Sequence, residues 1–196
     1  MAAAGLLLAL VCRVLWVLQT DGHTPTGDAA DYDHHARWIA AGDGYPPSLV
    51  GGPAAHRPPA YPYFLAGLYK LTGDSALSAR YAQAFLGAVA VGLIGLLAWR
   101  IWGARVGLIA LVLAAVFPPL IISSTTLISE ALVVPLVVAS IVTACEARRS
   151  RHALVWLSAS GALAGLVALT RPNGFLLLVP VAIAAWTTQA GGGGGG

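Results

Sequence analysis

ALSARYAQAFLGAVAVGLIGLLAWRI, residues 76–101, decides the fold, because this stretch is long and apolar enough to cross a membrane. A membrane-spanning helix needs about 20 mainly apolar residues to cross roughly 30 Å of hydrocarbon. The rest of the chain has the same character: 58% of its 196 residues are hydrophobic, 10% are charged, and the mean hydropathy is +0.77. This composition excludes an ordinary soluble domain. The sequence predicts an all-α, multi-pass transmembrane helical bundle.

Further apolar windows lie on both sides of this stretch. We expect spans at residues 2–18, 106–122, 127–145 and 153–170, and a shorter one at 174–187. A cleaved signal peptide is the alternative for the first of them. A retained anchor is favoured, because the segment lacks a basic start and has Arg13 and Trp16 where small residues should precede a cleavage site. All spans then belong to one module, residues 1–190.

The C-terminal residues 191–196 are all glycine. We expect a flexible tail there, and we expect the chain to be the N-terminal part of a longer protein.

Small residues at four-residue spacing predict close helix packing in two spans. Ala84, Ala88 and Gly92 follow this spacing in one span, and Gly161 and Gly165 follow it in another. Such spacing allows two backbones to approach closely. We expect this packing within the chain rather than a dimer contact.

Arginines indicate the orientation in the membrane. They gather around two short loops, residues 100–105 and 148–151, whereas most acids lie in loops on the opposite side. Basic loops stay cytoplasmic, so the N-terminus is predicted inside and the long loop at 20–75 outside. The net charge of +3 thus reflects topology, and no nucleic-acid partner is expected. High alanine and arginine content with a single lysine, Lys70, is typical of a GC-rich bacterial genome, so we expect a bacterial cytoplasmic membrane.

The outer loop concentrates the polar chemistry of the chain. It holds most of the acids and, with its edges, four of the five histidines. Apolar residues at helical spacing predict an amphipathic surface helix at Ala29–Ala41, and an aromatic-rich segment predicts a second at Tyr61–Leu71. Glycines and prolines interrupt regular structure between them.

In this predicted topology, four ionisable residues that are far apart in the sequence lie at the outer face: Asp28, Arg57, Glu130 and Arg171. Ionisable groups at membrane depth usually face a cavity or a partner. Each also has a structural interpretation. Asp28 stands where a helix N-cap belongs, and Glu130 can complement a helix dipole. Arg171 can anchor the chain at the interface, and Arg57 can extend toward lipid headgroups.

A metal site is a competing hypothesis for the histidines of the loop. Its ligands would be His34, His35 and His56 with Asp31 and Asp33. Neighbouring histidines on a helix point to different faces, however, and no ligand spacing such as HExxH is present. We therefore expect no metal and no cofactor.

Four segments in order resemble polyprenyl-phosphate-dependent glycosyltransferases of the GT-C fold. This group includes protein O-mannosyltransferases, in glycosyltransferase family 39, and the aminoarabinose transferases of lipid A. The segments are GDAADY at 27–32, RPPAYP at 57–62, Ser129-Glu130, and GALAGLVALTRP at 161–172. The resemblance covers nearly the whole chain before the glycine tail.

This resemblance implies roles for particular residues. The loop aspartate of the family, the catalytic base, corresponds to Asp28, and the basic residue that contacts the donor phosphate corresponds to Arg57. Many relatives carry Asp-Glu at the first position, whereas Ala29 follows here, so Asp31 can partly substitute for the missing carboxylate. The residues expected to bind substrate are Arg57, Arg171, Glu130, Asp31, Tyr32 and His56.

The residue types also fit sugar transfer from a lipid phosphate. A positioned carboxylate can accept the proton of an attacking hydroxyl, and guanidinium groups suit the charge of a leaving phosphate. We therefore predict an inverting membrane glycosyltransferase with a polyprenyl-phosphate sugar as donor, membrane lipids as surroundings, and an unspecified acceptor. The alternative is a non-catalytic membrane protein that binds or translocates a lipid-linked substrate.

Overall fold

Helices are the regular secondary structure of the residues that the structure describes. The computed structural model describes residues 1–196 except 23, 50, 52–56, 74, 184–185 and 187–196, so the glycine tail lies outside it. No strand occurs in these described residues. The helices are α1 (Ala2–Gln19), α2 (Asp28–Ala41), α3 (Ala60–Thr72), α4 (Ala76–Trp102), α5 (Ala104–Val116), α6 (Pro118–Ser123), α7 (Glu130–Ala147) and α8 (Ala153–Thr170), followed by the 3₁₀ helix η2 (Pro172–Leu177).

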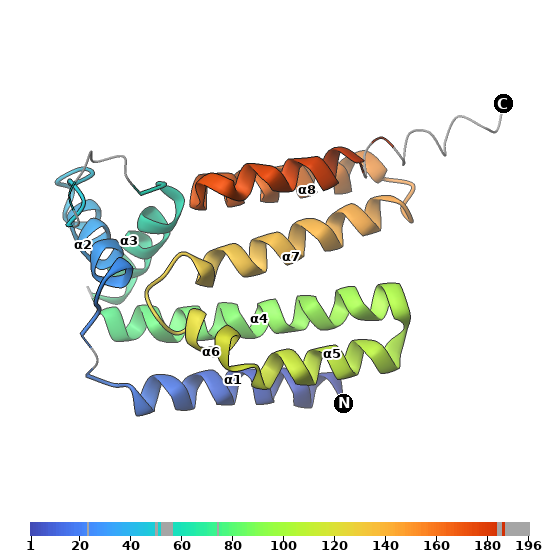
Figure 1. The fold of residues 1–196 in the computed structure, drawn as a ribbon, viewed down its shortest axis with the longest axis horizontal. Helices are drawn as coiled ribbons and strands as arrows, with labels where there is room; N and C mark the ends of the chain where they lie inside the picture. The colour runs from blue at the N-terminus through green and yellow to red at the C-terminus, as the bar shows by residue number, and fades with distance from the viewer. Residues whose placement is uncertain (23, 50, 52–56, 74, 184–185, 187–196) are drawn as a thin grey trace.

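Four of these helices, α1, α4, α7 and α8, are long and apolar enough to cross a membrane. They lie side by side along the long axis of the molecule, while α2 and α3 lie together at one end (Figure 1). The polar loop therefore folds over one end of the bundle, away from the N-terminus. The protein is an all-α, multi-pass integral membrane protein, as its composition predicts.

The apolar segment 106–122 does not form the single helix that we expected. It is divided into α5 and α6 at Phe117, whose backbone is extended at φ −72° and ψ 112°. Pro118 and Pro119 are the cause, because a proline lacks the N–H that continues a helix and disfavours helical geometry at the residue before it. By contrast, Pro135 lies within α7 without ending it.

The two helices of the loop form where the sequence predicts them, with bounds one residue wider at several ends. Tyr32 on α2 meets Tyr61 on α3 in a T-shaped contact, with ring centroids 4.8 Å apart. Both rings belong to a buried cluster that continues into the bundle through Ala79 of α4 and Ala131 of α7. This core fixes α2, and with it the acidic side chains, against the end of the bundle.

Candidate functional site

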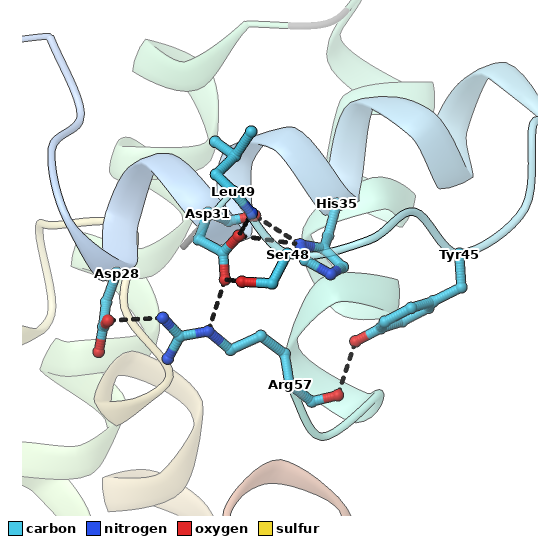
Figure 2. Close-up of polar contacts among 7 residues, drawn as sticks. All are labelled: Asp28, Asp31, His35, Tyr45, Ser48, Leu49 and Arg57. Atoms are coloured by element: carbon cyan, nitrogen blue, oxygen red, sulfur yellow. Dashed lines mark hydrogen bonds and ion pairs between the residues drawn. The ribbon is translucent and has the colours of Figure 1, made fainter. Parts of the chain in front are cut away.

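Asp31 is the centre of the polar site. Its side chain is fully buried and accepts three hydrogen bonds: from Arg57 Nε at 2.6 Å, from Ser48 Oγ at 2.9 Å, and from the Leu49 backbone N–H at 2.7 Å. Figure 2 shows these donors converging on the carboxylate from the loop that follows α2. His35 lies one turn further along α2 and donates through Nδ1 to the Asp31 carbonyl at 2.7 Å.

Arg57 joins the buried carboxylate to a second, exposed one. While Nε binds Asp31, Nη2 donates to Asp28 Oδ1 at 2.6 Å (Figure 2). The guanidinium carbon lies 4.9 Å from the centre of the Tyr32 ring, in a cation–π arrangement. The side chain of Arg57 is 12% exposed and that of Asp28 is 66% exposed. One guanidinium thus fixes two carboxylates from successive turns of α2.

These contacts keep both partners charged. Burial by itself raises the pKa of Asp31, but the hydrogen bonds from Arg57, Leu49 and Ser48 together outweigh it and hold the pKa below its usual value. Burial lowers the pKa of Arg57, but the hydrogen bonds to Asp28 and Asp31 outweigh that effect and raise it. The pair is therefore ionic at neutral pH.

Tyr45 holds the backbone of Arg57 in place. Its hydroxyl donates to the Arg57 carbonyl at 2.8 Å (Figure 2). Burial, with smaller effects from Tyr32, Tyr63 and Asp31, raises the pKa of Tyr45 to about 12, so the hydroxyl remains a donor at physiological pH. The ring also packs against His35 with centroids 4.8 Å apart.

Asp28 is not the N-cap of α2. Gly27 is the N-cap, with φ 57°, a left-handed conformation that favours glycine, and it makes no side-chain hydrogen bond to the helix. Asp28 is the first helical residue, so its carboxylate is free of capping and reaches Arg57. It also lines a cavity of about 340 Å³ beneath the start of α2, with Trp16, Thr20 and Ile128 among the other walls.

Glu130 and Arg171 form a separate pair. Glu130 is the first residue of α7, and Arg171 directly follows α8. Arg171 Nη1 donates to Glu130 Oε1 at 2.7 Å, with side chains 44% and 34% exposed respectively. Arg171 is thus more than an interfacial anchor, because it forms an ion pair with a carboxylate.

An apolar groove of about 650 Å³ lies near the same end of the bundle. It lies between α3, α7 and α8, and its walls include Pro59, Leu132 and Thr170. These residues follow Arg57, follow Glu130 and precede Arg171 at a distance of one or two positions. The residues that line the groove are thus close in sequence to Arg57 and Arg171, although neither arginine lines it.

Sequence reasoning missed Arg80. It lies in the second turn of α4, is 9% exposed, and lines the same cavity as Asp28. Its guanidinium donates to the Thr20 carbonyl at 3.0 Å, to the Thr20 hydroxyl, and to the Thr125 carbonyl at 2.8 Å. An arginine inside an otherwise apolar span was the pattern that could have identified it.

The structure brings together Asp28, Asp31, Tyr32 and Arg57 from the predicted set, and His56 lies outside the described residues. Among the described residues, no three His, Cys, Asp or Glu side chains are placed to hold a metal ion. The His34 ring lies beside the Trp38 ring in a tilted contact, with centroids 5.7 Å apart.

The fold and the site together define the class of protein: an integral membrane protein with a cluster of charged side chains at one end of its apolar helices. The family described as dolichyl-phosphate-mannose-protein mannosyltransferase matches residues 56–191, which is more than half of the chain. The chain belongs to this family and is a membrane glycosyltransferase of the GT-C kind. The match includes Arg57, Glu130 and Arg171 and begins after Asp28. No curated protein and no solved structure matches the chain.

Proposed function

We propose that this protein transfers a sugar from a polyprenyl-phosphate donor to an acceptor hydroxyl on the outer side of a bacterial cytoplasmic membrane. One observation carries the proposal: Arg57 ties the exposed carboxylate of Asp28 to the buried carboxylate of Asp31, at the wall of a cavity. A carboxylate held in place yet accessible is what general-base catalysis needs. Membership in the mannosyltransferase family supports the lipid-linked donor.

Asp28 acts as the base in this proposal. Its Oδ1 is held by Arg57, and the other oxygen has no hydrogen-bond partner among the described residues. The acceptor hydroxyl passes its proton to Asp28 while its oxygen forms a bond to the anomeric carbon. The bond between that carbon and the phosphate oxygen breaks, and the lipid phosphate leaves. A single displacement inverts the anomeric configuration.

Arg57 and Arg171 meet the charge of the donor phosphate. Arg57 uses two of its five N–H groups on Asp28 and Asp31, and the others remain for a phosphate oxygen. Arg171 is half-exposed, with Glu130 holding its orientation. The apolar groove between α3, α7 and α8 suits a polyprenyl chain, which has to stay out of water.

Asp31, Tyr32, Glu130 and His56 complete the proposed substrate site. Asp31 and Tyr32 act on Arg57, one through its charge and one through its ring face. The proposed reaction uses no metal and no cofactor, because the carboxylate and the guanidinium groups supply proton transfer and charge neutralisation.

The test is transfer of radiolabelled sugar from polyprenyl phosphate by the complete protein in membranes. Asp28→Asn keeps the shape of the side chain but removes the base, so we expect transfer to fall by about 10²- to 10⁴-fold. Asp43→Asn is the matched control, because Asp43 is an exposed aspartate just beyond α2, and it should transfer normally. Undiminished transfer by Asp28→Asn would refute the assigned base. Donor binding without turnover in the wild type would favour a binding or translocating protein.

A further inference from the structure

Arg13 is a buried arginine within the first apolar helix. It lies in the fourth turn of α1 and is 1% exposed. Its Nε donates to Ser124 Oγ at 2.9 Å, and Nη1 donates to the carbonyls of Ala9 at 2.9 Å and Ala115 at 3.4 Å. Within the described part of the chain these partners are all uncharged. A charge at this depth is costly, which calls for a reason why the fold keeps it.

The contacts of Arg13 lie on both sides of the proline break. In a continuous helix the Ala115 carbonyl would accept from the backbone nitrogen of residue 119, but Pro119 has no N–H. Arg13 donates to this carbonyl instead. Ser124 follows α6, and its hydroxyl donates to the Leu120 carbonyl at 2.6 Å while it accepts from Arg13. One guanidinium therefore ties the end of α5 to the end of α6.

Gly87 of α4 leaves the space that this arrangement needs. A Cβ at this position would lie 2.7 Å from Arg13 Nε and 2.5 Å from Ser124 Cβ, closer than real side-chain contacts. Three helices thus meet at Arg13, Gly87 and Ser124. The absence of a side chain at Gly87 is thus a second feature of the sequence that lets Arg13 and Ser124 meet.

The segment beyond Ser124 forms a wall of the Asp28 cavity. The next carbonyl, that of Thr125, accepts from Arg80, and the following residues, 126–128, line the cavity together with Asp28. The wall is therefore held at two successive residues by two buried arginines. Arg13 itself does not line that cavity.

We propose that Arg13 is a positioning residue: it fixes the broken segment α5–α6 and thereby sets the 126–128 wall of the cavity in which Asp28 lies. Its effect on sugar transfer rests on the proposed function. Its effect on the position of the wall does not.

The position of the wall can be tested by measuring how fast maleimide alkylates a single cysteine in membranes that contain the complete protein. Thr126→Cys is the reporter on the wall, and Asp43→Cys is the remote reporter in the outer loop between α1 and α4. Both carry Cys12→Ser and Cys145→Ser. We expect Arg13→Met to change the maleimide rate at the wall about fivefold, in the range for residues of one network, and to leave the remote rate unchanged. Ser124→Ala removes one acceptor without removing the charge, so it should shift the same rate in the same direction by less.

Unchanged wall rates in both Arg13→Met and Ser124→Ala would overturn the proposal. So would equal changes at the two reporters in Ser124→Ala, because these would indicate a general loss of structure. In the transfer assay, Ser124→Ala should raise KM more than it lowers kcat, because Asp28 and Arg57 are intact. If the alkylation rate at Thr126→Cys changes while KM and kcat do not, the effect of Arg13 on sugar transfer is contradicted. Undiminished transfer by Asp28→Asn would instead contradict only the proposed base.

Discussion

Arg57 organises the polar site at the scale of single residues. Its guanidinium lies between two carboxylates and over the ring of Tyr32, and its carbonyl is held by Tyr45. Every one of these contacts limits its freedom before substrate arrives. A site with fixed charges stabilises a developing phosphate charge without reorganising, which is the main source of electrostatic catalysis.

Asp31→Asn should destabilise the loop strongly, because it leaves Arg57 with an amide where a buried carboxylate accepted its N–H. Breaking a buried ion pair by removing one partner costs about 3 kcal/mol. Hydrogen exchange over residues 28–49 measures this loss. Asp43→Asn, at an exposed position, should change the same exchange by less than about 0.5 kcal/mol. Equal protection in the two variants would contradict the central role of Asp31.

The same loop should be sensitive to acid. The pKa of Asp31 in the folded loop lies below the value of 3.8 expected for the unfolded chain. Its contribution to stability is therefore complete above about pH 3.8 and is lost as the pH falls through the folded pKa. Hydrogen exchange of residues 28–49 as a function of pH should show this acid-induced loss in the wild type. Asp31→Asn should remove the part of the pH dependence that belongs to this carboxylate, and an unaltered profile would argue against it.

Close backbone contact between α4 and α5 is the main packing feature at the scale of the helices. A Cβ at Gly107 would lie 2.6 Å from Trp99 Cβ and 2.9 Å from the Gly95 carbonyl oxygen. The predicted contact at Gly92 is also close, since a Cβ there would lie 2.9 Å from a methyl carbon of Leu6. These glycines let helices approach in a membrane, where packing rather than burial from water holds them together.

The predicted packing of Gly161 and Gly165 is wrong for the described residues, because a Cβ at either position would have no heavy atom of another helix within 4 Å. The face of α8 that meets α7 carries Ser160, which exchanges hydrogen bonds with Ser140 of α7 at 3.0 and 2.9 Å. The rotation of α8 about its axis, which the glycine spacing does not determine, selects this face.

Gly107→Ala and Gly165→Ala form a matched pair of substitutions. Gly107→Ala should destabilise the protein by about 1–3 kcal/mol, because the added methyl group has to displace backbone atoms. Gly165→Ala meets open space in a helix and should be neutral or stabilising by up to about 1 kcal/mol. Thermal unfolding of the purified protein in detergent compares them. A larger loss in Gly165→Ala than in Gly107→Ala would contradict this packing.

The whole molecule has an acidic end and a basic end. The Asp28–Arg57 site lies at one end of the bundle, and the turns of the 100–105 and 148–151 segments lie at the other (Figure 1). At the basic end Arg100 pairs with Glu146 at 3.0 Å, and Arg149 donates to the Arg100 carbonyl at 2.8 Å. Arginines in short loops favour the cytoplasmic side, so we expect the basic end to face the cytoplasm.

The orientation predicts which end an impermeant maleimide reaches in intact bacterial cells. With the native cysteines replaced by serine, Asp43→Cys should react and Ser150→Cys should not, because the first lies beside the polar site and the second lies in a basic turn. Both should react after permeabilisation, which serves as the control. Labelling of Ser150→Cys alone would reverse the orientation and place the site in the cytoplasm.

The sequence by itself determined the membrane class, the two surface helices and the family, because hydropathy, helical spacing and short motifs are properties of neighbouring residues. It also predicted Asp28 and Arg57 as site residues, and their side chains form a pair in the structure. Only the tertiary structure revealed Asp31 as the buried centre, since its partners lie 17, 18 and 26 residues away. The tie between Arg13 and Ser124, 111 residues apart, has the same origin. Contacts across such separations depend on how helices rotate and pack, and no local pattern contains that information.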